Sequence, residues 1–458
     1  MAKYQAYAEY KDSGVEWLGA LPSHWTMNKL RYLFSFGKGL TITKENLVDE
    51  GTPCVSYGEV HSKYSFAVDP LKHHLKCVEE SYLKTSPNAL LQKGDFVFAD
   101  TSEDLKGSGN FTHLVNDEKV FAGYHTIIAR PQDQSVSRFY AYLFDSQEFR
   151  SQIQLAVKGV KVFSITQAML RAANIWLPSK AEKQNIANFL DHETTKIDRL
   201  IEKQKQLIEL LKEKRQAVIS HAVTKGLDPN VPMKDSGVEW LGEVPEHWDI
   251  VQAKYIADIT RGAILRPVDA PEYFDEEGEW AYLNISDATK CDKYLDESKL
   301  RLSQLGSTKS ARVYPNNLII TASATIGKAF INRIKVCVHD GFIPFCNIKL
   351  DINYLYHYVS NPYLYAAMGK SNTQKNIYLD EVKNMMVTVP PRCEQVAIVK
   401  HIESSQFKYD GLIQSANSAI KLMQERRTAL ISAAVTGKID VRNWQAPTLA
   451  EADTELSA

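Results

Sequence analysis

The chain has 458 residues and a formal net charge of -1, with 44% hydrophobic and 24% charged residues. This length allows about two to four domains, and the composition is typical of a globular protein. The near-zero charge excludes any argument for nucleic-acid or membrane binding from bulk charge, so such an argument has to rest on local patches.

The cysteines and the N-terminus indicate the cellular compartment. The six cysteines form no CxxC pair, which favours a reducing environment and no structural zinc. The N-terminal sequence MAKYQAYAEYKDSG has no apolar signal-peptide segment, and no long uncharged apolar run follows it. We therefore expect a cytoplasmic protein.

A nine-residue sequence near the N-terminus occurs a second time in the chain. KDSGVEWLG occupies residues 11–19 and again 234–242, at an offset of 223, and a Pro-x-His-Trp match follows in both copies. Chance identity of this length is negligible, so the chain contains an internal repeat. We call residues 11–25 and 234–248 the first and second box. Their tryptophans suit either core packing or a repeated docking surface for a partner; the candidates are Trp17, Trp25, Trp240 and Trp248.

Each box is followed by a segment that predicts a mixed α+β domain. Short aromatic or β-branched runs are separated by Gly, Pro and Asn. The runs are DFVFAD (95–100) and HTIIAR (125–130) in the insert 27–177, and NLIITASA (317–324) and FIPFCNIKL (342–350) in the insert 249–389. A helix-like aromatic stretch follows in both, at residues 137–153 and 352–368.

Residues 181–224 predict one long helix. A narrow apolar seam recurs at alternating steps of three and four, with polar breaks at Glu193, Gln204 and Lys214. The seam is Ile186, Leu190, Glu193, Ile197, Leu200, Gln204, Leu207, Leu211, Lys214 and Val218. A helix of some 40 residues spans roughly 60 Å. Such a helix requires a partner.

The second half of the chain supplies that partner. A seam of the same spacing runs from Ile398 to Leu430, at an offset of 212 from the first. Its polar or small positions Ser405, Ala416 and Arg426 match the three breaks of the first helix, and Gly226 and Gly437 stand where helix C-caps are expected. The offsets 223 and 212 differ by 11, so the second insert is 11 residues shorter. The frame is therefore repeated, whereas the inserts differ.

These features predict an α+β fold with two globular domains in a pseudo-two-fold repeat, separated by two long helices that form an antiparallel coiled coil. In chain order, we expect a first domain at 1–180, a helix at 181–224, a linker at 225–233, a second domain at 234–390, a helix at 391–436 and a disordered tail at 441–458.

Local charge points to a polyanion. Residues 299–378 hold ten basic and two acidic residues, and residues 150–181 hold five basic residues and no acid. Both inserts thus end in a basic part, which favours a polyanion site over an ordinary solvated face.

Arg and Lys read guanine, whereas Asn and Gln read adenine, so these residue types are the candidates for reading bases. They occur in basic loops at matched places of the two inserts. The first matched pair of loops has an offset of 212 and contains Lys158 and Lys161 in the first insert, and Lys370, Asn372, Gln374, Lys375 and Asn376 in the second. The second pair has an offset of 223 and contains Lys38 and Arg261.

No catalytic signature is complete. Residues 361–363 resemble the NPPY box of amino-methyltransferases but lack its second proline, and Gly327-Lys328 lacks the first glycine and the Ser/Thr of a phosphate loop. Two D/E-x-K tripeptides, at 104–106 and 297–299, are too common to indicate a nuclease. No set of histidines and cysteines has the spacing of a metal site.

The boxes KDSGVEWLGALPSHW and KDSGVEWLGEVPEHW, together with helices that begin E-x-Q-x-x-I, resemble the specificity subunit of type I restriction–modification systems over residues 11–440. The second helix keeps Glu394, Gln395 and Ile398 but lacks the Asp and Thr that the first has at Asp191 and Thr194-Thr195.

The resemblance implies a non-catalytic, cytoplasmic DNA-binding subunit that serves phage defence. Each insert would be a target recognition domain that reads one half of a bipartite site in double-stranded DNA, and the helices would set the spacing. Two methyltransferase subunits, which bind S-adenosylmethionine, would dock on the repeat. A translocating nuclease subunit, which uses ATP and magnesium, would join for cleavage. The alternatives are a stand-alone methyltransferase or nuclease, and a coiled-coil scaffold without a DNA role.

Overall fold

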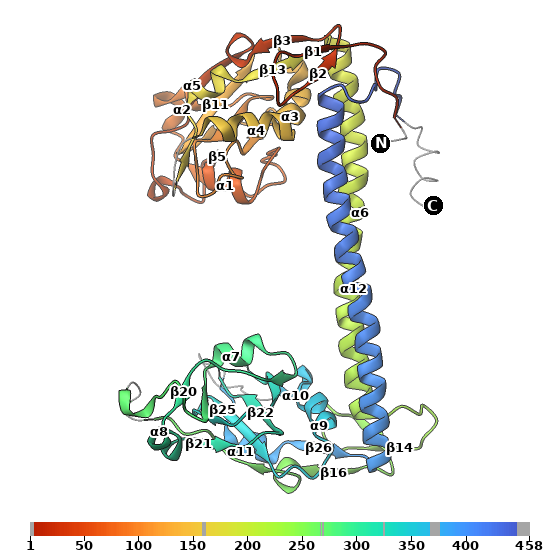
Figure 1. Ribbon diagram of the computed structural model, residues 1–458. Coiled ribbons are helices and arrows are strands. Elements are labelled where there is room, and N and C mark those ends of the chain that lie inside the picture. Colours follow the sequence, from red (N-terminus) through yellow and green to blue (C-terminus); the bar gives the residue numbers. More distant parts are fainter. Residues whose placement is uncertain are drawn as a thin grey trace. The chain divides into compact units, whose positions relative to one another are not determined.

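The computed structural model describes residues 4–157, 162–265, 267, 270–323, 326–366 and 376–446 (Figure 1). The chain divides into two compact units. Unit 1 comprises Met1–Gln204 and Ser418–Ala458, and unit 2 comprises Lys205–Asn417. Each unit contains one α/β part and a portion of each of the two long helices, α6 (Lys180–Lys225) and α12 (Arg392–Val435).

The centre of unit 1 is an antiparallel four-stranded sheet of order β4-β11-β7-β9, formed by Phe34–Lys38, Thr126–Pro131, Phe96–Ala99 and Phe111–His113. A three-stranded sheet of order β10-β5-β6 lies beside it, formed by Phe121–Ala122, Thr52–Val55 and Cys77–Val78. Three two-stranded ladders join β1 (Tyr10–Asp12) to β2 (Ala20–Pro22), β12 (Phe163–Ser164) to β8 (Thr101–Ser102), and β13 (Asn174–Leu177) to β3 (Thr26–Lys29).

The short helices of unit 1 pack around these sheets. They are α1 (Tyr57–Ser62), α2 (Tyr82–Thr85), α3 (Ser137–Asp145), α4 (Gln147–Ala156) and α5 (Gln167–Ala172), with 3-10 turns at Leu30–Tyr32, Lys44–Asn46, Pro87–Ala89 and Gln134–Val136. Because α3 is aromatic on nearly every face, it is almost wholly buried between the four-stranded sheet and α6.

Unit 2 has a five-stranded sheet of order β17-β25-β22-β23-β19, formed by Asp258–Ile259, Phe342–Cys346, Asn317–Thr321, Ala329–Asn332 and Tyr294–Leu295. A four-stranded sheet has the order β20-β18-β24-β21, formed by Arg301–Leu302, Trp280–Leu283, Val336–Val338 and Ala311–Val313. Two ladders join β14 (Met233–Asp235) to β15 (Glu243–Pro245) and β16 (Asp249–Gln252) to β26 (Met386–Val389).

Unit 2 has short helices as well. They are α7 (Ile285–Lys290), α8 (Gln304–Lys309), α9 (Ile352–Val359), α10 (Pro362–Ala366) and α11 (Leu379–Asn384), with 3-10 turns at Ala253–Tyr255 and Pro271–Tyr273. The apolar face of α9 packs with the five-stranded sheet and the end of α6 in one core.

The predicted α+β fold is confirmed, and the four predicted strand runs correspond to β7, β11, β22 and β25. Each helix-like aromatic stretch is broken into two helices by a capping residue. Ser146 Oγ accepts a hydrogen bond from the Phe149 amide at the start of α4, and Asn361 Oδ1 accepts one from the Tyr363 amide at the start of α10. The residues 361–363 that resemble a methyltransferase box therefore form a turn between helices.

The two long helices pack side by side in antiparallel directions, and this prediction is confirmed in each unit by itself (Figure 1). In unit 1, Arg427 Nε donates to Asp198 Oδ1 at 3.1 Å. In unit 2, Arg215 donates to Asp410. The offset of 212 relates Asp198 to Asp410 and Arg215 to Arg427, so the two ion pairs are copies of one contact.

The predicted seam is wrong at three positions of the first helix, whereas Gln204, Leu211 and Val218 are half-buried as expected for seam positions. Leu200, Leu207 and Lys214 are exposed, and the inward positions are held by the next residue in each case, Ile201, Ile208 and Arg215. The same shift occurs in the second helix, where Leu412 and Arg426 face outward and Ile413 and Arg427 face inward. The inward stripe takes a step of four residues from Ile197 to Ile201, whereas the predicted seam took a step of three from Ile197 to Leu200.

Gly226 and Gly437 end the two helices with φ values of +76° and +70°. These left-handed conformations confirm the predicted glycine caps. No helix within the described residues is long and apolar enough to cross a membrane.

Candidate DNA interface

In unit 1 the candidate residues gather at one end of the four-stranded sheet, where β4 ends and β11 begins. Lys38 is exposed and is paired with Ile127 across the β4–β11 ladder. Gly39 donates its amide to the Thr126 carbonyl at 3.2 Å. A Cβ on Gly39 would lie 2.0 Å from the Gly123 carbonyl oxygen, so only glycine fits here. The close approach fixes the Gly-Lys-Gly segment against the sheet.

The chain that follows the second candidate loop of unit 1 lies at the same end of the sheet. Lys158 and Lys161 themselves lie outside the described residues. The chain that follows them is anchored by the β12–β8 ladder and by the Ile165 amide, which donates to the Asp100 carbonyl at 2.8 Å. Asp100 directly follows β7, the strand next to β11. The Lys38 segment and the described residues that follow the second candidate loop therefore lie at one sheet end.

Unit 2 repeats this arrangement. Arg261 is exposed, and its Nε donates to the Asp340 carbonyl at 2.9 Å, just before β25. Gly262 donates to the Phe342 carbonyl at 3.0 Å, and a Cβ on it would lie 1.9 Å from the His339 carbonyl oxygen. Burial lowers the pKa of His339, which favours the neutral ring at this sheet end.

The second candidate loop of unit 2 is anchored as in unit 1. The Ile377 amide donates to the Ala322 carbonyl at 2.9 Å, the copy of the Ile165 contact at an offset of 212. Asn376 is half-buried beside it. The remaining candidates in the loop lie outside the described residues; they are Lys370, Asn372, Gln374 and Lys375. In both units, then, the residues that directly follow the second candidate loop are bonded at the sheet end where Lys38 or Arg261 lies.

A pocket of about 710 Å³ opens at this end of unit 1. Tyr57 forms an aromatic wall, with its ring centroid 6.2 Å from that of His61 and 5.5 Å from that of His125. The loop after β8 completes the rim with Glu103, Lys106 and their neighbours. None of these residues had been singled out as a binding residue from the sequence, because β-strand pairing rather than chain proximity brings them together.

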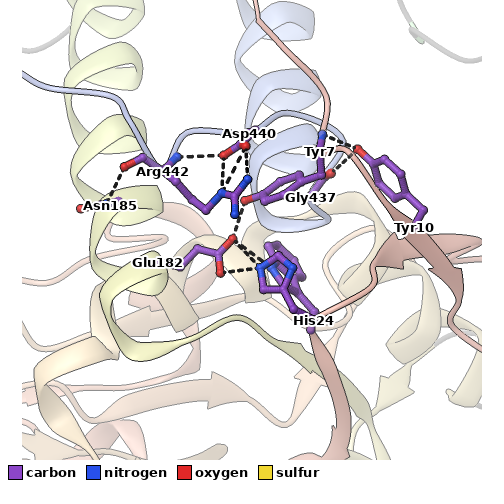
Figure 2. A network of polar contacts seen from close by, with 9 residues as sticks. Tyr7, Tyr10, His24, Glu182, Asn185, Gly437, Asp440 and Arg442 are labelled. Carbon is purple, nitrogen blue, oxygen red and sulfur yellow. Dashed lines mark hydrogen bonds and ion pairs between the residues drawn. The ribbon is translucent and has the colours of Figure 1, made fainter.

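The boxes contact the ends of the long helices. In unit 1 the Glu182 carboxylate, in the first turn of α6, is buried and accepts three hydrogen bonds (Figure 2). The donors are Tyr7 Oη at 2.6 Å, Trp25 Nε1 at 3.0 Å and His24 Nε2 at 3.1 Å. A Cβ on Gly437 would lie 2.4 Å from the Pro22 ring. The first box thus contacts the start of α6 and the end of α12.

The second box repeats this contact in unit 2. Glu394, near the start of α12, accepts hydrogen bonds from His247 Nε2 at 2.7 Å and Trp248 Nε1 at 2.9 Å. The Trp248 ring also lies against Gly226 at the end of α6. The glutamates are copies at an offset of 212, although the sequence had not indicated them as partners of the boxes.

The tryptophan positions bear on partner docking. Trp25 and Trp248 are fully buried, so neither offers an indole surface to another protein in this fold. Trp17 and Trp240 are half-buried, and their rings pack against Trp176 and Tyr358. Within each unit, the tryptophans of the box therefore pack against the domain and the ends of the long helices.

In unit 1, residues 7–10 also contact residues 437–442, which follow the end of α12 (Figure 2). Tyr10 Oη donates to the Gly437 carbonyl at 2.9 Å, and the Arg442 guanidinium lies 4.9 Å from the Tyr7 ring centroid and pairs with Asp440. Asn185 Nδ2 donates to the Arg442 carbonyl at 3.1 Å. Burial and the Glu182 carboxylate raise the pKa of Tyr7, which therefore remains a proton donor.

The outward leucines of the long helices form matched pairs. Unit 1 exposes Leu200 (40%) and Leu422 (65%), and unit 2 exposes Leu412 (45%) and Leu210 (62%). The offset of 212 relates Leu200 to Leu412 and Leu210 to Leu422. Each unit therefore carries one copy of the same pair, which we call the outer leucine pair.

Within the described residues, no group of three His, Cys, Asp or Glu side chains is placed to hold a metal ion. The tripeptide Asp104-Leu105-Lys106 forms a turn in which Asp104 Oδ1 accepts the Gly107 amide at 2.6 Å. Gly327 lies against the Tyr365 ring, where a Cβ would come within 2.5 Å of it.

These features define a protein with a duplicated frame, in which each copy combines an α/β domain, a box and a long helix. The sequence profile of the type I restriction modification DNA specificity domain matches residues 22–210 and 245–414. The chain therefore belongs to this family.

Relatives and solved structures of similar length agree with this assignment. The chain is 22% identical over 449 residues to a putative type I restriction enzyme MjaX specificity subunit of Methanocaldococcus jannaschii, covering 96% of this chain and 99% of the relative. It is 22% identical to the EcoKI specificity subunit of Escherichia coli, covering 93% and 92%.

The fold resembles that of the HsdS subunit from Thermoanaerobacter tengcongensis, with a TM-score of 0.53, 14% identity, and 92% and 98% of the two chains covered. A chain from a study of complex assembly and conformational transition of the type I restriction–modification system gives a TM-score of 0.66, 16% identity, and 92% and 99% coverage.

Proposed function

We propose that this protein is the non-catalytic, sequence-specific DNA-binding subunit of a type I restriction–modification complex, in which each unit reads one half of a bipartite, asymmetric site. The observation that supports this most directly is the duplicated sheet end, where Lys38 in unit 1 and Arg261 in unit 2 stand at copies of one position. Because the inserts differ in sequence, the two half-sites differ.

In this proposal the recognition domains are residues 1–180 and 234–390, the linker 225–233 connects the first long helix to the second domain, and the helices 181–224 and 391–436 set the half-site spacing. Lys158, Lys161, Lys370, Asn372, Gln374, Lys375 and Asn376 contact DNA beside Lys38 and Arg261. Two methyltransferase subunits supply S-adenosylmethionine chemistry, and restriction subunits supply ATP- and magnesium-dependent cleavage. The complex works in the cytoplasm.

A domain exchange tests the modular reading of DNA. The complex of this chain with its methyltransferase partner is used to select sites from a library of random double-stranded DNA. Replacing residues 27–177 by the insert of another family member is expected to change one half-site and leave the other intact. Selection of no sequence by the unaltered complex would refute the function, and a change in both half-sites would refute modularity.

We propose that the outer leucine pairs are the docking surfaces of the methyltransferase subunits. The duplicated pair offers two equivalent surfaces for two copies of one partner, and exposed leucines on a helix fit an apolar helix face. Replacing Leu200 and Leu422 by Ser is expected to reduce the stoichiometry from two methyltransferase copies to one, as measured by native mass spectrometry.

The matched variant Leu412→Ser with Leu210→Ser affects unit 2 and is expected to give the same result. Combining all four substitutions is expected to abolish binding while circular dichroism remains unchanged. Retention of both copies in the fourfold variant would contradict this assignment.

A further inference from the structure

The pocket of unit 1 carries two charged side chains that the fold does not use. Glu103 and Lys106 are exposed on its rim, three residues apart in the loop after β8. The backbone carbonyl of Lys106 accepts from Gln154 Nε2 at 3.5 Å, but neither charged side chain has a hydrogen-bond or ion-pair partner in the part of the chain that the structure describes. Their charges are opposite, so together they present one hydrogen-bond acceptor and one set of donors.

The loop that carries them is held in place. Asp104 Oδ1 accepts the Gly107 amide at 2.6 Å, and Ser102 Oγ donates to the Asp104 carbonyl at 2.7 Å. A Cβ on Gly107 would lie 2.4 Å from Ser102 Oγ. The turn therefore presents the two charged side chains from a fixed backbone rather than from a loose loop.

A chain of hydrogen bonds also fixes the pocket floor. His61 Nε2 donates to the Thr101 carbonyl at 2.8 Å, so its Nδ1 accepts from Asn110 Nδ2 at 2.9 Å. Asn110 Oδ1 in turn accepts from Arg150 Nη1 at 2.8 Å, and Arg150 pairs with Asp145 at 3.1 Å. These hydrogen bonds hold the imidazole in one tautomer and fix the Asn110 side chain beside it.

The opposite wall contains a strained residue. His125 has φ of +55°, a left-handed conformation that is rare for a residue other than glycine, and its Nδ1 lies 3.2 Å from Asp100 Oδ1. Strain of this kind is concentrated at ligand-binding sites. His125 directly precedes β11, and Val162, which also lines the pocket, directly precedes β12.

From this geometry we propose that Glu103 and Lys106 read a G·C base pair in the half-site of unit 1. In the major groove guanine presents two acceptors, O6 and N7, and cytosine presents the N4 amino donor. The Lys106 ammonium donates to guanine and the Glu103 carboxylate accepts from cytosine. An A·T pair fits less well, because its donor lies between two acceptors and the thymine methyl group would face a charged side chain.

This inference rests on the proposed DNA-reading function, and one selection experiment separates the two. The full chain, in complex with its methyltransferase partner, selects from a library of random double-stranded DNA before and after Glu103→Gln with Lys106→Gln. We expect the variant to lose about tenfold or more of its preference for G·C at one position of one half-site, with the other half-site unchanged.

The matched control is Glu80→Gln with Lys84→Gln, which removes the same two charges from exposed positions at α2 that do not line the pocket. It is expected to leave the selected sequence unchanged, and thermal unfolding checks that both variants remain folded. Each single variant is also tested, and Lys106→Gln is expected to relax the guanine more than Glu103→Gln does.

The outcomes are distinguishable. If the unaltered complex selects no sequence, the proposed function fails. If it selects a bipartite site that the pocket variant also selects in full, or if binding weakens without any change in sequence preference, the base-reading role of Glu103 and Lys106 is overturned while the function stands. Relaxation at an A·T position, or in both half-sites, would equally overturn it.

Discussion

One buried histidine in each unit is expected to make that unit sensitive to acid. His113 in unit 1 is 3% exposed, donates from Nδ1 to the Phe66 carbonyl at 2.6 Å and stacks on Phe96. Burial lowers the pKa of His113 to about 4, and burial likewise lowers the pKa of His357 in unit 2 to about 4. Both rings are therefore neutral in the folded protein at neutral pH.

The direction of the pH effect follows from proton binding. Between the ordinary histidine pKa of 6.5 and about 4, the unfolded chain takes up a proton that the folded state does not. The stabilising contribution of the neutral buried histidine is fully present above this pH range and is lost as the pH falls through it. For His113 alone the loss approaches about 3 kcal/mol in the free energy of unfolding.

Replacing His113 with Gln tests this dependence. The amide can still donate to the Phe66 carbonyl, but it does not titrate, so the fall in the free energy of unfolding between about pH 7 and pH 4 should become shallower. Urea denaturation at both pH values measures it. His74, which is exposed, provides the control His74→Gln. An equal slope in His113→Gln and the unaltered protein would show that His113 does not cause the acid sensitivity.

Glu182 and Glu394 are copies of one residue in different surroundings. Glu182 has 4% of its side chain exposed and serves three donors, whereas Glu394 has 37% exposed and serves two. Water can replace a lost partner only where the site is open. The same substitution should therefore cost more in unit 1.

Glu182→Ala is expected to lower the free energy of unfolding by roughly 3 kcal/mol, because it leaves the buried Tyr7 and Trp25 donors unsatisfied. The matched variant Glu394→Ala is expected to lower it by roughly 1 kcal/mol. Chemical denaturation compares them. An equal or reversed order would mean that the burial of Glu182 does not determine the energetic weight of this contact.

At the level of single elements, the seam of the long helices shows what periodicity can and cannot predict. The sequence predicts the length, partner and direction of both helices. It does not fix the phase of the inward stripe, because Leu200 and Ile201 are adjacent and equally apolar. Packing resolves this choice in favour of Ile201, which is 8% exposed, over Leu200, which is 40% exposed.

Alanine substitution distinguishes the two stripes. Ile201→Ala removes an inward side chain and is expected to lower the free energy of unfolding by roughly 2 kcal/mol, whereas Leu200→Ala should cost less than about 0.5 kcal/mol. Thermal and urea unfolding of the two variants measure the difference. A larger loss for Leu200→Ala would restore the seam first predicted from the sequence.

The sites show the same division between what sequence can and cannot supply. The repeat predicts that Lys38 and Arg261 occupy copies of one position, and both lie beside the first residues of an equivalent strand. The pocket wall of Tyr57 and His125 was not predictable, because its members are far apart in sequence and meet only through the pairing of strands. The glutamates that bind the boxes were likewise hidden, since the boxes and helices repeat at different offsets.

At the scale of the whole molecule, the contacts between the long helices are repeated in both units, whereas the inserts differ. The Asp198–Arg427 pair of unit 1 is repeated as Asp410–Arg215 in unit 2. By contrast, the Asp145 that receives Arg150 and Arg427 in unit 1 corresponds, at an offset of 212, to His357, which is buried in unit 2. The ion pairs that Asp145 makes in unit 1 therefore have no copy at His357 in unit 2, whereas the Asp–Arg pair between the helices occurs in both units.

This frame predicts how spacing can be changed. If the coiled coil sets the distance between the half-sites, inserting seven residues between positions 204 and 205 and seven between 417 and 418 keeps the inward stripe and both Asp–Arg pairs. The insertion lengthens the coil by about 10 Å. Because B-DNA advances 34–36 Å per 10–10.5 base pairs, the selected sites should gain about three base pairs between unchanged half-sites.

Selection from random double-stranded DNA by the complex with its methyltransferase partner measures this spacing. The control inserts the same seven residues into α6 alone. That change shifts Ile201 and Ile208 against α12 and should lower the midpoint of thermal unfolding rather than lengthen the spacer. An unchanged spacer in the doubly lengthened, folded protein would mean that the long helices do not determine the distance between the half-sites, and the setting of the spacing would then have to lie in the recognition domains themselves.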